Sequence, residues 1–165
     1  MGTDVAQRDQ DQSLAASTPL LPSRVTSQLD DEASYRRVSG PPFLEWHPPD
    51  LTIEEARAAV VALEAALVPA RPEEIAMRVL RLSAHFGEAK RSQDAWRVIA
   101  EDFAEDLAPY PPDIISAGIT AHRQNSIYWP KPKELRDLMH PLLARRRSHL
   151  RWLRQFVERE GQEAA

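Results

Sequence analysis

The sequence predicts an all-α protein, a small helical bundle of about five helices with a disordered N-terminal arm and an extended C-terminal helix. From residue 51 onward, apolar residues recur at the three- and four-residue spacings of an amphipathic helix. Prolines divide this pattern into segments of helical length. No segment alternates apolar and polar residues in the manner of a half-buried strand.

Residues 1–50 form the predicted arm. They lack a sustained apolar period and are rich in Gln, Ser, Asp and Pro, a composition that buries too little apolar surface to fold alone. Within the arm, residues 20–29 carry leucine and valine side chains suited to a short contact element. Residues 40–49, GPPFLEWHPP, have the composition of an extended proline-rich segment. Its aromatic side chains either fold back on the domain or lie on another surface.

Two predicted helices follow the arm. Thr52 and Glu55 have the spacing of a capping box at the start of the first helix, and Pro69 ends it. Pro72 suits the first turn of the second helix, where a missing N–H costs nothing. The expected buried stripes are Ile53, Ala56, Val60, Leu63 and Leu67 in the first helix and Ile75, Val79, Leu82 and Phe86 in the second.

The third and fourth predicted helices are separated by Pro109, Pro111 and Pro112. Ser92 caps the third helix. Gly118 lies inside the fourth helix, which it weakens by up to ~1 kcal/mol, so we expect it to pack closely against a neighbour. The inward positions are Trp96, Ile99, Ala100, Phe103 and Leu107 in the third helix and Ile114, Ile115, Ile119 and His122 in the fourth.

A last helical stretch starts at Pro132 and should be kinked or split in two by Pro141. We therefore divide the chain into a disordered, proline-rich arm (1–50), a helical domain (51–140), and a basic C-terminal helix and tail (141–165). The last stretch continues the core with Leu135, Leu138, Met139, Leu142 and Leu143. The core residues that we expect to be buried together are Trp96, Phe103, Ile115 and Leu135.

The chain carries no recognisable catalytic, cofactor or metal motif. It has no cysteine, which excludes disulfides and thiolate metal sites. None of the five histidines pairs with another at the spacing of a helical zinc site, and there is no phosphate-binding glycine loop or nucleophile elbow. We interpret the acidic cluster Glu101, Asp102, Glu105 and Asp106 as a solvated helix face. We therefore expect a protein that is not an enzyme and needs no cofactor or metal.

Acidic residues predominate in the N-terminal part of the chain and basic residues in the C-terminal part. The net charge is −4; residues 1–50 carry eight acids and four arginines, and residues 131–165 carry nine basic residues and five acids. No apolar run approaches the roughly 20 residues of a membrane-spanning helix, and the N-terminus lacks the features of a secretory signal. We expect a soluble cytoplasmic protein with no membrane partner.

An arginine-rich segment of the last helix is the candidate partner-binding site. Its members are Arg145, Arg146, Arg147, Arg151, Trp152, Arg154 and Phe156. Such a segment can neutralise nucleic-acid phosphates and stack on a base, dock in an acidic groove of a protein, or lie solvated beside the bundle. We favour a protein over DNA, because the acidic front of the chain would repel DNA. Trp152 lies off the apolar stripe, so we expect it to be exposed.

Residues 96–138 carry a distinctive order of helix ends and aromatic–proline steps. The order is Asp106-Leu107-Ala108, Pro109-Tyr110-Pro111, a helix with Ile114 and Ala117, Tyr128-Trp129-Pro130, and a helix that opens with Glu134-Leu135. In this order the segment resembles the helical domains of phage and prophage replication proteins that load or regulate the replicative DNA helicase of the host. In this chain the predicted flexible segment is N-terminal, whereas helicase-binding segments in several such proteins are C-terminal.

The resemblance implies a small adaptor that binds a ring helicase and opens or delivers it at an origin. It carries over no single residue as a contact, and packing is the expected role of Tyr128-Trp129-Pro130. The alternative is a phage or prophage helical interaction or assembly protein with no replication role. Direct DNA binding through the arginine segment is a third hypothesis, although no helix-turn-helix is recognisable. No feature of the sequence sets the oligomeric state.

Overall fold

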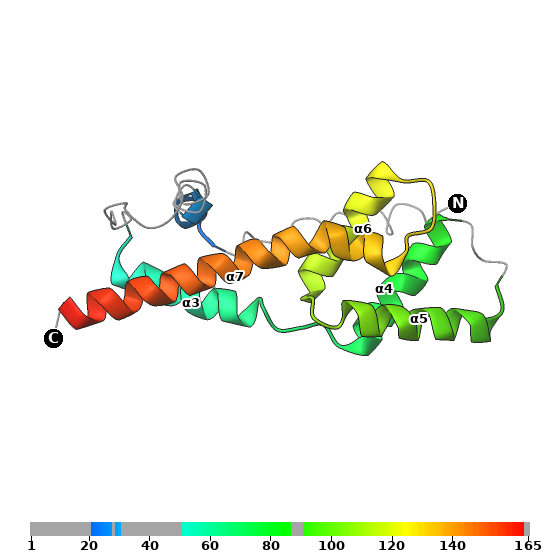
Figure 1. Cartoon of the computed structure of the whole chain (residues 1–165), viewed down its shortest axis with the longest axis horizontal. Coiled ribbons are helices and arrows are strands. Elements are labelled where there is room, and N and C mark those ends of the chain that lie inside the picture. Colours follow the sequence, from blue (N-terminus) through cyan, green and yellow to red (C-terminus); the bar gives the residue numbers. More distant parts are fainter. Residues whose placement is uncertain (1–20, 28, 31–50, 87–90, 164–165) are drawn as a thin grey trace, which may run out of the picture. The chain divides into compact units, whose positions relative to one another are not determined.

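The computed structural model describes residues 21–27, 29–30, 51–86 and 91–163, and no strand occurs among them. The labelled helices are α3 (Ile53–Ala65), α4 (Pro72–His85), α5 (Gln93–Leu107), α6 (Pro112–Asn125) and α7 (Pro132–Glu163) (Figure 1). The predicted all-α class is confirmed. Each of the five helices predicted after residue 51 is present.

Side chains at the helix starts explain where several helices begin. The predicted capping box is present, since the Glu55 N–H donates to Thr52 Oγ1 at 3.2 Å and the Thr52 N–H donates to Glu55 Oε2 at 2.8 Å. Ser92 caps α5 by accepting from the Ala95 N–H at 3.3 Å. A similar bond precedes two other helices. The Arg71 N–H donates to Glu74 Oε2 at 3.3 Å before α4, and the Lys131 N–H donates to Glu134 Oε2 at 2.8 Å before α7.

Helix α7 runs through Pro141 without interruption. The sequence predicts that Pro141 either kinks this helix or splits it in two, and the predicted split is wrong. Proline removes one backbone hydrogen bond, at a cost of roughly 3 kcal/mol in a helix interior. Met139 and Leu143 are buried on either side of Pro141, so packing of this face offsets that cost. The predicted boundary between residues 140 and 141 falls inside the helix.

The chain divides into two compact units, and α7 contributes to both. One unit comprises Met1–Leu63 with Leu153–Ala165. In its described part, residues 23–27 and 29–30 are helical and form the predicted short contact element, while residues 40–49 lie outside the described residues. Arg24 forms an ion pair with Glu55 at 3.6 Å. The buried apolar side chains described in this unit are Leu21, Val25, Leu29, Leu51, Ala56, Ala59, Leu63, Leu153 and Phe156.

The other unit, Glu64–Trp152, holds α4, α5, α6 and the first part of α7. Helix α4 packs against α5 and α6 (Figure 1). Phe103, Ile115 and Leu135 belong to one buried cluster, as predicted. The prediction that Trp96 is buried with them is wrong, since its side chain is only half-buried. Trp96 lies in the first turn of α5 and packs on Trp129, with a distance of 5.3 Å between the two ring centroids.

Gly118 makes the predicted close contact. A Cβ built at this position would lie 2.5 Å from Cγ of Met139, a fully buried residue of α7. Real Cβ atoms do not approach other atoms this closely, so only glycine lets α6 and α7 meet at this distance. The weak helix propensity of Gly118 is thus offset by packing.

Candidate protein-interaction surface

The loop between α6 and α7 presents two large apolar side chains to solvent. Ile127 is 82% exposed and Tyr128 is 75% exposed. Val61, Val68 and Met77 are also exposed, but Ile127 and Tyr128 have the highest exposed fractions among the large apolar side chains of the described residues, and they adjoin in the chain. Contiguous exposed apolar side chains can mark a surface that another protein covers. The pair forms the tip of the segment Ser126–Pro130, which we call the apolar loop.

Hydrogen bonds fix the backbone of the apolar loop. Ser126 Oγ accepts from the Tyr128 N–H at 3.1 Å and lies 3.3 Å from the Tyr128 carbonyl oxygen. The buried His122 ring lies with Nε2 at 2.9 Å from the same carbonyl oxygen, which can only accept, so Nε2 is the donor of this hydrogen bond. The Ser126 N–H donates to the His122 carbonyl at 2.9 Å. Ile127 and Tyr128 are therefore held on a defined scaffold.

Trp129 anchors the other end of the apolar loop. Its ring lies edge-on to Phe86, Trp96 and Phe103, with centroid distances of 6.2, 5.3 and 5.9 Å. Such edge-to-face pairs add about 0.5–1.5 kcal/mol each beyond their buried area. The packing role expected for the Tyr128-Trp129-Pro130 step is confirmed for Trp129, whereas Tyr128 points outward.

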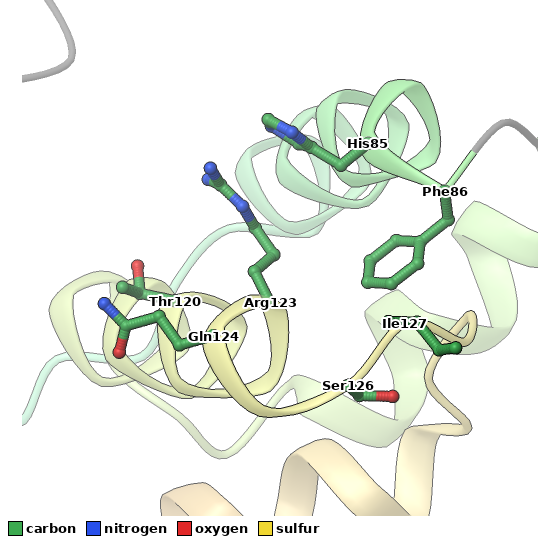
Figure 2. A pocket seen from close by; sticks show the side chains of 7 residues that line it. All are labelled: His85, Phe86, Thr120, Arg123, Gln124, Ser126 and Ile127. Atoms are coloured by element: carbon green, nitrogen blue, oxygen red, sulfur yellow. The ribbon is translucent and has the colours of Figure 1, made fainter.

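A hollow of about 440 Å³ lies beside the apolar loop. Figure 2 shows Arg123 reaching from α6 toward α4, and the Phe86 ring extending from the end of α4 toward the loop. The lining residues are His85, Phe86, Thr120, Arg123, Gln124, Ser126 and Ile127. This surface therefore combines apolar and cationic groups.

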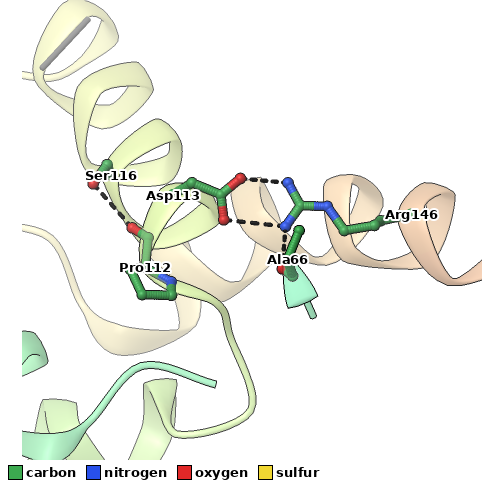
Figure 3. Close-up of polar contacts among 5 residues, drawn as sticks. All are labelled: Ala66, Pro112, Asp113, Ser116 and Arg146. Atoms are coloured by element: carbon green, nitrogen blue, oxygen red, sulfur yellow. Dashed lines mark hydrogen bonds and ion pairs between the residues drawn. The ribbon is translucent and has the colours of Figure 1, made fainter. Parts of the chain in front are cut away.

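The predicted arginine-rich site does not form one surface. Arg146 is directed into the fold, with a side chain that is only 14% exposed. Its guanidinium forks onto the Asp113 carboxylate, and Nη1 also donates to the Ala66 carbonyl at 2.6 Å (Figure 3). Arg146 therefore joins three segments of the Glu64–Trp152 unit, which is a structural role.

Trp152 is buried, at 8% exposure, and so is Phe156, at 3%. The expectation that Trp152 is exposed is wrong. The enclosed face of α7 is wider here than a single helical stripe, since it comprises His149, Leu150, Trp152, Leu153 and Phe156. Four members of the predicted site are exposed, namely Arg145, Arg147, Arg151 and Arg154. Their role in binding stays a prediction.

Among the described residues, no group of three or more His, Asp or Glu side chains could hold a metal ion. Glu101, Asp102 and Glu105 are exposed, and Asp106 forms an ion pair with Arg136 at 2.9 Å. None of the described helices is long and apolar enough to cross a membrane.

Comparison of the chain with protein-family models, with curated proteins and with solved structures finds no match. The site is therefore defined by its own geometry. The exposure of Ile127 and Tyr128 was not predicted from the sequence, because the order of residues in a loop does not show which side chains face the core. The one available signal was their place between Ser126, at the end of α6, and the aromatic–proline step Trp129-Pro130.

Proposed function

We propose that this chain is a non-enzymatic helical adaptor that acts in the cytoplasm by binding another protein through the apolar loop. The observation that carries the proposal is the exposure of Ile127 and Tyr128 on a backbone held by Ser126 and His122. A preorganised apolar contact loses little conformational entropy when a partner covers it. Tyr is also among the residues that most often dominate binding energy at protein interfaces.

The partner that we propose is the replicative helicase of a phage-type DNA replication system. Support comes from the resemblance of residues 96–138 to replication proteins that load or regulate such helicases. This stretch includes most of α5, all of α6 and the start of α7, and the apolar loop lies within it. The same surface would also serve a phage or prophage interaction or assembly protein, and the experiment below separates these two functions.

The test is a binding measurement between the purified full chain and the purified replicative helicase of the host, by sedimentation velocity. The expected result is a complex with a defined stoichiometry that is lost when Ile127 and Tyr128 are both changed to Ser. Matched controls are Val68→Ser and Val98→Ser, which remove exposed apolar side chains elsewhere in the same unit. No complex at micromolar concentrations would contradict the helicase assignment and favour the assembly role.

A further inference from the structure

The hollow beside the apolar loop is lined by polar side chains that the fold does not use. The side chains of His85, Thr120, Arg123 and Gln124 make no hydrogen bond or ion pair with any described residue. All four belong to the last turns of two helices, α4 and α6, and line one space (Figure 2). They are thus available to a group from outside.

The charge of this lining has one sign. Arg123 and His85 supply cationic or hydrogen-bond-donating groups, and no acidic residue is among the described residues that line the hollow. Helix dipoles favour a cation near the C-terminal end of each helix, which accounts for one basic residue on α4 and one on α6. The dipoles do not account for Thr120 and Gln124, which line the same space.

We propose that this hollow receives an acidic side chain of a partner protein segment, and that an apolar side chain of the same segment packs on Phe86 and Ile127. The inference rests on the proposed function and deepens it by naming the chemistry of the partner. The Arg123 guanidinium offers paired N–H groups that match a carboxylate. Thr120 and Gln124 supply further donors around it.

The apolar part of the hollow selects a protein segment over a nucleic acid. Phe86 and Ile127 line the space together with Arg123, and the exposed Tyr128 lies next to Ile127 in the chain. A protein segment can supply an aliphatic or aromatic side chain beside a carboxylate. A phosphate backbone instead requires several cations along its path, whereas only Arg123 and His85 are basic here. The volume of about 440 Å³ is within the usual range of ligand sites, about 300–1,000 Å³.

The experiment is a selection of peptides from a random display library on the immobilised full chain. The expected result is enrichment of sequences with Asp or Glu next to Leu, Phe or Trp. Binding of an enriched peptide should weaken by about tenfold or more in Arg123→Glu, as when hydrogen bonds to a charged group are lost. Arg57→Glu, an equal charge change at an exposed arginine on α3, should leave binding unchanged.

A charge swap separates recognition from folding. The same peptide with Lys in place of its acid should bind Arg123→Glu better than it binds the unchanged chain. Enrichment without acids, or acidic peptides that bind Arg123→Glu as well as the unchanged chain, would overturn the inference. Helicase binding that depends on Tyr128 but not on Arg123 would refute the inference and leave the proposed function standing. Acidic-peptide binding without helicase binding would refute only the named partner.

Discussion

Arg146 and Asp113 lie 33 residues apart in the chain and form a two-point ion pair between α7 and the first turn of α6. One of its two hydrogen bonds, from Nη1 to Oδ1, measures 3.1 Å. The same Nη1 donates to the Ala66 carbonyl just after α3. The pair thus closes the Glu64–Trp152 unit at the point where three segments converge.

Arg146→Lys should therefore lower the free energy of unfolding. Lysine keeps the charge but cannot donate to two carboxylate oxygens and the Ala66 carbonyl in the same planar geometry. The expected loss is about 1–2 kcal/mol, below the value for a fully buried pair because the Asp113 side chain is 51% exposed. Chemical denaturation of Arg146→Lys, Asp113→Asn and the double variant measures it. Strictly additive losses would contradict a direct coupling.

The pair also predicts a pH dependence of stability. Burial alone would raise the pKa of the Asp113 carboxyl, but the hydrogen bonds and charge of Arg146, together with backbone hydrogen bonds from Ile114 and Asp113, outweigh burial, so the pKa is lowered below its ordinary value. A lowered folded-state pKa gives stability that is present above the unfolded pKa, about 3.9, and is lost as pH falls through the folded pKa. The difference in unfolding free energy between the unchanged chain and Asp113→Asn should shrink in acid. A difference that is constant from neutral to acid pH would refute this.

Gly118→Ala should destabilise the protein although alanine is the better helix former. The new methyl would meet the buried Met139 side chain, and overpacking of a core typically costs about 1–3 kcal/mol. Thermal and chemical unfolding give the sign directly. Combining Gly118→Ala with Met139→Ala should cost less than the sum of the two single changes, because the contact is then relieved. A stabilised Gly118→Ala variant would mean that α6 and α7 are further apart.

The sequence predicts the helices well because their signals are local. Thr52 with Glu55, Ser92, Pro72 and Pro132 each determine a start within one turn of helix. The Arg146–Asp113 pair has no local signal, since its two members are distant in sequence. The burial of Trp152 was missed for a related reason. The spacing of apolar residues predicts the centre of the buried face of a helix, but the width of that face depends on which other segments pack against the helix.

Trp152→Ala should lower the free energy of unfolding, because the structure buries this side chain. A buried tryptophan changed to alanine typically costs about 3–5 kcal/mol. Arg147→Glu and Arg151→Glu change exposed residues and should stay within about 0.5 kcal/mol of the unchanged chain. Chemical denaturation compares the three variants. An unchanged stability of Trp152→Ala would restore the view that this side chain is a partner contact.

Ile127 and Tyr128 could not be identified from the sequence as the exposed pair. Apolar residues near an aromatic–proline step suit a core as well as a surface. The structure distinguishes them from Trp129, which packs against three aromatic rings, while its two neighbours face solvent. Their exposure depends on the bonds that Ser126 and His122 make to the Tyr128 backbone, which are tertiary and loop features.

The most direct test of the proposed role of the apolar loop is the affinity of the Tyr128→Ser variant for the replicative helicase, measured by titration calorimetry, together with the thermal unfolding of the same variant. If the apolar loop binds the partner, this affinity should be at least about tenfold weaker than that of the unchanged chain, as for truncation of an interface hot spot, with an unchanged melting temperature. Only the exposed ring is removed, and the backbone bonds of residue 128 remain. An unchanged helicase affinity, with Tyr128→Ser fully folded, would contradict the claim that the apolar loop is the partner-binding surface.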